Sequence, residues 1–186
     1  LNSKHPILLN NIAKTYISIG DIEKAMKYCK KAISYDQNSD EFKKTLSLIL
    51  IKNYDFKNAW LFFDGRLGLS DFIIKNSTLD LVKNKIPLNK NLEENSKILI
   101  IREQGLGDEI LYGTMYGDLL NRFANVIIEC DERLLELFKN SFKKQFADKF
   151  VKLGTYSSSK NQIKNFDYVI YAGSLGRLFR NKRVDW

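Results

Sequence analysis

An aspartate directly behind a glycine turn is the part of this sequence best suited to chemistry. Asp108 follows Gly105-Leu106-Gly107, and this turn follows the apolar run Ile98–Ile101. A carboxylate above the carboxyl end of a strand, beside backbone N–H donors, can accept a proton from a substrate hydroxyl. Aspartate also caps helix N-termini and binds metal ions. The residue types leave all three roles open: helix cap, general base and metal ligand.

The remaining sequence narrows the chemistry. It contains one histidine, His5, and no acidic cluster with a metal-binding spacing. This composition disfavours a metal site and excludes serine–histidine catalysis, so we expect neither a metal nor a cofactor. Cys29 and Cys130 fall in different regions and are predicted to be small core residues in a reduced compartment.

A dinucleotide site is the first alternative for the glycine turn. Gly105 and Gly107 begin a possible fingerprint, and Glu129 follows Gly107 by 22 residues, near the distance expected of a ribose-binding acid. The third glycine is missing, since position 110 is isoleucine, and the Asp108 carboxylate would repel a pyrophosphate. The pattern therefore disfavours NAD binding.

Alternating strands and helices are predicted to position this turn. The apolar spacing of Ile110, Leu111, Met115 and Leu119 predicts an amphipathic helix after the strand 98–101. Further segments are predicted as strands at 126–130, 150–153 and 167–171, a helix at 132–140, a loop at 154–165, and a turn or helix opened by Gly173-Ser174-Leu175-Gly176. Such alternation predicts a Rossmann-like parallel α/β sheet with ligands at its carboxyl edge.

The N-terminal part carries an internal repeat. Asp21-Ile22-Glu23-Lys24-Ala25 recurs as Asp55-Phe56-Lys57-Asn58-Ala59, 34 residues later, which is the period of the tetratricopeptide repeat. Residues 7–67 are therefore predicted to form two helical hairpins. Two repeats are fewer than the three needed for stability, so the array should continue before Leu1 or dock on the following domain. Trp60, Phe62 and Phe63 are the predicted docking face, with a peptide-binding groove as the rival interpretation.

Three segments follow from these patterns: repeat helices at 1–70, a linker at 71–96 with one short helix at 78–84, and an α/β domain at 97–186. The net charge of +8 is spread along the chain. Only residues 177–183 concentrate four cations, which we interpret as a solvated helix end, so nucleic-acid binding is disfavoured. No apolar run approaches the roughly 20 residues of a membrane span, and no signal peptide is recognisable, so we expect a cytoplasmic protein.

The α/β segment resembles a known enzyme family. Its sequence ILIIREQGLGDEILYGTMYGDLL, followed by VIIECDERLLELF and FDYVIYAGSLGRLFR, resembles the N-terminal half of GT-B glycosyltransferases that bacteria carry behind tetratricopeptide repeats. These proteins are similar to the lipopolysaccharide heptosyltransferases and to the O-linked N-acetylglucosamine transferases. The most specific part of the resemblance is Glu103–Asp108, which contains the Gly-Asp pair that opens the first helix in heptosyltransferases.

The resemblance implies a nucleotide-sugar donor, a glycan or protein acceptor, and Asp108 as the acceptor-activating base. It also implies substrate-lining roles for Gln104, Gly105, Leu106 and Gly107, and for Gly173, Ser174 and Leu175. The donor-binding C-terminal domain of such enzymes is not in this sequence, so we expect a fragment that is inactive alone. The alternative is a non-catalytic tetratricopeptide module that binds a protein partner.

Overall fold

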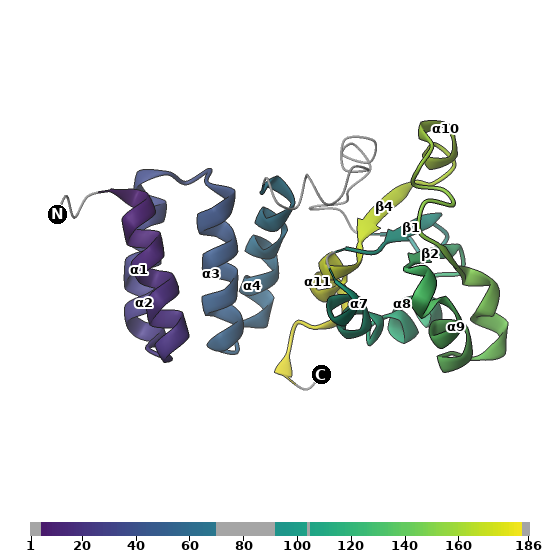
Figure 1. Ribbon diagram of the computed structural model, residues 1–186, viewed down its shortest axis with the longest axis horizontal. Helices are drawn as coiled ribbons and strands as arrows, with labels where there is room; N and C mark the ends of the chain where they lie inside the picture. The colour runs from purple at the N-terminus through teal and green to yellow at the C-terminus, as the bar shows by residue number, and fades with distance from the viewer. Residues whose placement is uncertain (1–4, 70–91, 104, 184–186) are drawn as a thin grey trace. The chain divides into compact units, whose positions relative to one another are not determined.

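The computed structural model describes residues 5–69, 92–103 and 105–183 (Figure 1). Its chain contacts define two compact units. The helical unit takes in Leu1–Ile73 and Arg180–Trp186, and the α/β unit takes in Ile74–Phe179. The predicted domain limits at 70 and 96 stay a prediction, because the linker and its expected helix at 78–84 lie mostly outside the described residues.

The helical unit consists of two hairpins, as predicted. Its elements are α1 (Pro6–Ile19), α2 (Ile22–Tyr35), α3 (Asp40–Lys52), α4 (Phe56–Phe63) and the 3-10 turn η1 (Asp64–Gly68). Local chemistry sets these limits. Gly20 ends α1 with a positive φ of 84°, and Asp21 begins α2 by accepting a hydrogen bond from the Lys24 amide at 3.0 Å. Asp55 caps α4 in the same way, which explains why the Asp-containing motif recurs.

Small side chains allow these helices to pack closely. The fully buried positions of the unit include Ala13, Ala25, Cys29, Ala32 and Ala59. Ala32 packs with Leu9 and Phe42, and the other four share a core with large apolar residues such as Leu46 and Ile49. This alternation of small and large residues is the packing that the repeat pattern predicts.

The residues that follow the α/β unit return to the helical unit. The Trp60 indole N–H donates to the Arg180 carbonyl at 2.6 Å, and the Arg183 guanidinium lies 4.8 Å from the Tyr54 ring centroid. Arg180 is buried. The interpretation of 177–183 as a solvated helix end is therefore wrong for Arg180, because α11 (Gly176–Phe179) ends before it and the backbone beyond is fixed by Trp60. Docking of Trp60, Phe62 and Phe63 on the following domain stays a prediction.

The α/β unit contains a four-stranded parallel sheet in the order β3-β2-β1-β4. Its strands are β1 (Ile98–Ile101), β2 (Val126–Cys130), β3 (Phe150–Lys152) and β4 (Tyr168–Tyr171). Ile98 is paired with Val126 on one side and with Tyr168 on the other. The fold class predicted from the sequence, helical hairpins followed by a parallel α/β sheet, is thereby confirmed.

Among the described residues, one face of this sheet is covered by α7 (Leu106–Gly113), α8 (Tyr116–Arg122) and α9 (Glu132–Ser141) (Figure 1). Their buried side chains share one core with alternate strand residues such as Ile98, Ile100 and Ile128. The connections add four short elements: η3 (Lys144–Lys149), α10 (Lys160–Ile163), η4 (Ala172–Leu175) and α11. The predicted loop at 154–165 thus contains the one-turn helix α10.

The predicted apolar face of the helix behind the glycine turn is wrong for Ile110 and Leu111, whereas Met115 and Leu119 are buried as predicted. Two helices, α7 and α8, replace the single expected one, and Ile110 and Leu111 are about half exposed. The buried positions of α7 are Glu109, Tyr112 and Gly113. The buried face includes a charged residue because the Glu109 carboxylate has ionic and hydrogen-bonding partners inside the unit, described below.

Candidate functional site

The site predicted from sequence lies where β1 and β4 end. These strands are neighbours in the sheet, so the segments that follow them leave the same edge. Glu103, 1% exposed, joins the two segments by accepting a hydrogen bond from the Gly173 backbone N–H at 2.5 Å. The structure therefore brings the Gly105–Asp108 turn next to the segment Gly173–Leu175.

The predicted substrate-lining residues differ in exposure. Gly105 and Gly107 are exposed, Leu106 and Ser174 are partly exposed, and Gly173 and Leu175 are buried. The Leu175 side chain belongs to the core of the α/β unit, which leaves only its backbone for contact with a ligand. Gln104 lies outside the described residues.

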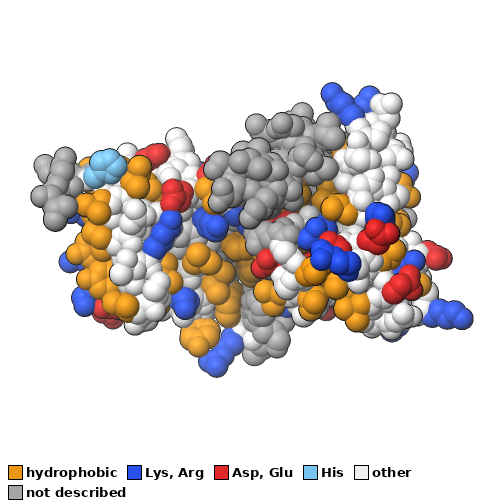
Figure 2. All heavy atoms as spheres, viewed as in Figure 1, with side chains coloured by type: hydrophobic (Ala, Val, Ile, Leu, Met, Phe, Trp, Pro, Cys, Tyr) orange, Lys and Arg blue, Asp and Glu red, His pale blue; other side chains and the backbone are white. Residues whose placement is uncertain are grey.

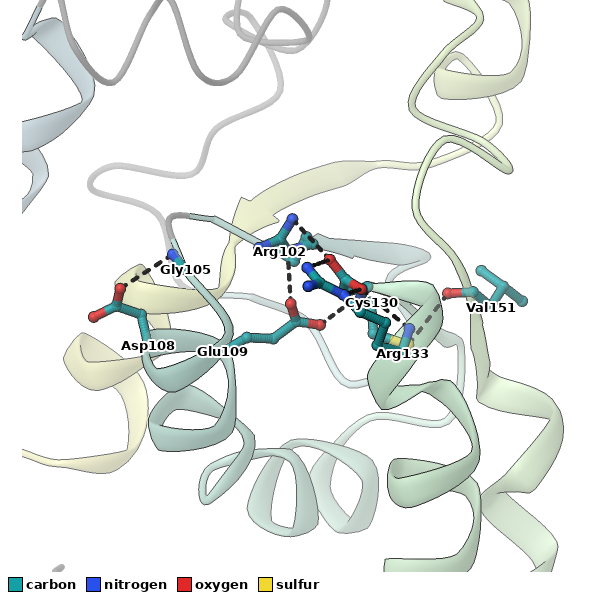
Figure 3. A network of polar contacts seen from close by, with 8 residues as sticks. Arg102, Gly105, Asp108, Glu109, Cys130, Arg133 and Val151 are labelled. Atoms are coloured by element: carbon teal, nitrogen blue, oxygen red, sulfur yellow. Dashed lines mark hydrogen bonds and ion pairs between the residues drawn. The ribbon is translucent and has the colours of Figure 1, made fainter.

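Asp108 occupies the first turn of α7. The N-cap of this helix is Gly105, and Asp108 stands at the third helical position, so the hypothesis that Asp108 is the N-cap residue is wrong. Its carboxylate instead reaches back to accept a hydrogen bond from the Gly105 N–H at 3.1 Å, as the acid of a capping box does (Figure 3). Asp108 is partly exposed. A Cβ atom added at Gly107 would meet no described atom within 4 Å, so the described residues leave the outer side of this turn open.

A polar network anchors the same turn to the sheet (Figure 3). The Glu109 carboxylate is fully buried, accepts a hydrogen bond from the Asp131 N–H at 2.8 Å and pairs with Arg102 Nε at 2.6 Å. Asp131 in turn lies 3.5 Å from Arg102 Nη1 and 2.8 Å from Arg133 Nε. Arg102 and Asp131 directly follow β1 and β2, so the network closes over the carboxyl ends of both strands.

The two carboxyl groups of this network respond to it in opposite directions. Burial raises the pKa of Glu109, and the Asp131 amide and the Arg102 guanidinium only partly offset this effect. Hydrogen bonds from Arg133 hold the pKa of Asp131 well below its usual range. Burial therefore disfavours the charged form of Glu109, whereas Arg133 strongly favours the charged form of Asp131.

Glu129 is unavailable as a ribose ligand. Its fully buried carboxylate accepts hydrogen bonds from the backbone N–H groups of Gly154, Tyr156 and Ser157 at 3.1, 2.6 and 2.9 Å, and from the Ser157 hydroxyl. These four donors bind the segment after β3 to the end of β2. The internal role of Glu129 argues further against a dinucleotide site.

Nucleophilic and metal chemistry find no support in the described parts of the chain. Cys29 and Cys130 are buried free thiols, and burial raises the pKa of each to about 12. Such thiols stay protonated and are poor nucleophiles. No three metal-ligating side chains gather anywhere among the residues that the structure describes.

A hollow of about 500 Å³ lies between α1 and α3 of the helical unit. Its lining combines three apolar and five polar residues: Ile17, Leu48, Leu69, Lys14, Ser18, Glu41, Lys44 and Thr45. Lys14 and Glu41 form an ion pair at 2.5 Å. Within the described ranges Lys44 makes no ion pair, so the hollow presents one uncompensated cation.

Charge is otherwise dispersed. On the face seen in Figure 2, basic side chains lie on both units with acidic side chains among them. This distribution differs from the continuous basic stripe of a nucleic-acid interface. No helix formed by the described residues is long and apolar enough to cross a membrane.

Residues 7–39 match the family model of the tetratricopeptide repeat. The first hairpin of the helical unit is thus a tetratricopeptide repeat, which supports a role of this unit in protein interaction. No curated protein and no solved structure matches the chain.

Sequence reasoning missed the residues that hold the site together: Arg102, Glu103, Glu109 and Asp131. A signal for three of them was present, because Arg102 and Glu103 directly follow β1, and Asp131 directly follows β2. Charged residues directly after buried parallel strands meet at one edge of a sheet. Glu109 gave no such signal, since a single charge within a helix normally marks the solvent face.

Proposed function

We propose that the α/β unit is the acceptor-binding half of a GT-B glycosyltransferase and that the tetratricopeptide helices recruit its partner. The observation that carries this proposal is the hydrogen bond between Glu103 and Gly173. It holds the Gly-Asp turn beside the segment after β4, and these are the two segments that the resemblance assigns to substrate binding. Among the described residues nothing fills the space outside Gly107, which supports a place for the acceptor there.

Asp108 is the general base in this proposal. Its carboxylate takes the proton of an acceptor hydroxyl while the hydroxyl oxygen bonds to the anomeric carbon of a nucleotide sugar. The bond from that carbon to the nucleotide diphosphate breaks, and the diphosphate leaves with the electron pair. The nucleotide sugar would bind to a second α/β domain, which the family resemblance implies.

A transfer assay on the native full-length polypeptide tests the enzyme proposal. It combines UDP-, GDP- and ADP-sugars with glycan and peptide acceptors. We expect Asp108→Asn to lower kcat by about 100-fold or more. The asparagine oxygen can still accept the Gly105 N–H, so the thermal midpoint should change little. Asp148→Asn is the matched control, because Asp148 is exposed and precedes β3 at the opposite edge of the sheet.

Two outcomes would contradict the proposal. Full turnover by Asp108→Asn would remove Asp108 as the base. Failure of the full-length polypeptide to transfer any of these sugars would leave protein binding by the repeats as the function.

The hollow between α1 and α3 favours this second function. Its lining includes the apolar residues Ile17 and Leu48, and Lys44 adds a cation that makes no ion pair among the described residues. A protein segment that combines apolar and acidic side chains complements this surface. The tetratricopeptide match at 7–39 includes α1 and α2, and α3 completes the hollow.

Peptide binding to the present chain tests the hollow. We expect a labelled peptide rich in aspartate and leucine to bind more tightly than one rich in lysine and leucine. Leu48→Glu should weaken binding by about tenfold or more, since it replaces an apolar lining residue by an acid. Leu61→Glu is the control, because Leu61 is exposed on α4 outside the hollow. Equal affinity of both variants would exclude the hollow as the binding site.

A further inference from the structure

We propose that Glu109 is a positioning residue that aims Asp108 at the acceptor, an inference that rests on the proposed glycosyl transfer. The two residues are consecutive in the first turn of α7. Figure 3 shows their side chains on opposite sides of this turn, with Glu109 directed to Arg102 and Asp108 to Gly105. One residue therefore faces the interior and the other lies beside the open space.

The contacts of Glu109 fix the start of α7 at two separate points. One carboxylate oxygen accepts the Asp131 N–H at 2.8 Å, directly after β2. The other lies 2.6 Å from Arg102 Nε, directly after β1. Because Arg102 and Asp131 directly follow β1 and β2, whose residues are mostly buried, they hold the start of α7 in a fixed position on the sheet. A rotation or shift of α7 would break both contacts and would move Asp108 with the helix.

An apolar residue would fill this buried position at lower cost. Burying a carboxylate without water is unfavourable, and the raised pKa of Glu109 reflects that cost. The hydrogen bond and ion pair of Glu109 instead fix the orientation of the first turn of α7, because such contacts are directional and apolar contacts are not. We infer that the charge is retained to orient the turn rather than to stabilise the fold.

A purely structural role would have a different signature. If Glu109 only stabilised the unit, its substitution would lower the amount of folded enzyme in any background. If it acts through Asp108, its effect on turnover should vanish once Asp108 is no longer a base. A double-mutant cycle between the two positions separates these cases.

The experiment measures kcat and KM of full-length Glu109→Gln, Asp108→Asn and the double variant. The substitution Glu109→Gln keeps the length of the side chain and removes its charge. We expect it to lower kcat by about 10- to 100-fold, with the KM for the nucleotide sugar unchanged. In the Asp108→Asn background it should cause no further loss. Glu136→Gln is the control, since Glu136 is exposed on α9 and pairs only with Lys139 among the described residues.

Arg102→Lys provides a second variant if Glu109→Gln folds poorly. It keeps the positive charge and loses the planar fork that reaches both Glu109 and Asp131. A smaller loss of kcat is expected, again absent in the Asp108→Asn background.

The outcomes distinguish the inference from the proposed function. Equal losses of kcat in both backgrounds would overturn the positioning role and leave glycosyl transfer intact. Normal turnover of Asp108→Asn would overturn the base assignment and the positioning role together. Loss confined to the background that retains Asp108 would support both.

Discussion

At the scale of single residues, the carboxyl groups near the strand ends differ in their hydrogen-bond and ion-pair partners, and these partners decide what each group contributes. Asp131 has Arg133 and Arg102 beside it, Glu109 has one arginine and one amide, and Glu129 has four donors and no cation in its hydrogen bonds. Glu129 and Asp131 lie at the carboxyl end of β2, and the Glu109 carboxylate reaches the same place from α7. Their consequences for stability are nevertheless different and can be measured separately.

Asp131 should stabilise the fold only while it is ionised. Its pKa is lowered from 3.8, first by the Arg133 side chain, so the native state favours the carboxylate more than the unfolded state does. The resulting stabilisation is complete above about pH 4 and is lost as the pH falls below 3.8. Asp131→Asn should therefore lower the free energy of unfolding at about pH 7, and its difference from the parent protein should shrink steadily as the pH falls from about 4 to about 2.

Urea unfolding across this pH range measures the effect, with Asp148→Asn as the control. A constant difference between Asp131→Asn and the parent protein at every pH would show that the Asp131 charge does not contribute.

Gly113 should be intolerant of even one methyl group. A Cβ atom at this position would lie 2.8 Å from Cε1 of Phe138, so α7 and α9 could not keep their present distance. We expect Gly113→Ala to destabilise the protein by about 1–3 kcal/mol. Gly117→Ala on α8 is the matched control, because its Cβ would lie 3.8 Å from Phe142, an ordinary contact.

The comparison uses the free energy of unfolding of both variants. Gly117→Ala should be neutral or stabilising by up to about 1 kcal/mol, since alanine favours helix over glycine. Equal free energies for the two variants would contradict the close packing of α7 on α9.

At the scale of elements, the sequence predicts uninterrupted strands and helices better than the broken helix behind the glycine turn. β1 and β2 lie where the apolar runs 98–101 and 126–130 predict them, since a strand buried on both faces leaves a continuous apolar signal. Only the later part of the predicted helix face behind the glycine turn, Met115 and Leu119, is buried, because α7 ends at Gly113 and α8 starts a new helical phase at Tyr116. An apolar pattern read across this break treats the buried faces of α7 and α8 as the face of one continuous helix.

In the candidate site, too, the sequence predicts the local features and misses the long-range contacts. The sequence predicts the turn at Gly105–Asp108 and its place behind a strand, because glycine and apolar patterns are local. The bond from Glu103 to Gly173 spans 70 residues, and the one from Glu109 to Asp131 spans 22. Such contacts depend on strand order, which β1, β2 and β4 acquire only in the folded sheet.

Glu129 should govern the element that follows β3. Its carboxylate accepts three backbone N–H groups and one hydroxyl from residues 154–157. Glu129→Ala would leave buried donors unpaired, so we expect a destabilisation of about 3 kcal/mol or more. Amide exchange at Tyr156 and Ser157 should accelerate before global unfolding.

Glu132→Ala is the control for this substitution. Glu132 is exposed and pairs with Lys152 at 2.6 Å, so its loss should cost less than about 1 kcal/mol. Unchanged exchange at Tyr156 in Glu129→Ala would contradict the anchoring role of Glu129.

At the scale of the whole molecule, one of the two compact units is built from two stretches of chain that are far apart in the sequence. The helical unit includes residues from both ends of the chain, because Arg180 and Arg183 contact Trp60 and Tyr54. The repeat period and the α/β alternation predict the two kinds of fold. Neither pattern could predict this return, since it depends on one backbone carbonyl and one indole that are 120 residues apart.

The returning segment should therefore stabilise the helices although it lies outside their repeats. Truncation after Phe179 removes the acceptor of the Trp60 N–H and the cation over Tyr54. We expect the free energy of unfolding of the helical unit to fall by about 1–3 kcal/mol, because the buried indole loses this acceptor. Truncation after Arg183 is the matched control, since it keeps both contacts.

Both shortened chains retain Trp60 as their single tryptophan, so its fluorescence during urea unfolding reports on the helical unit alone. Identical midpoints for the two truncations would mean that residues 180–183 lie against the helices without stabilising them.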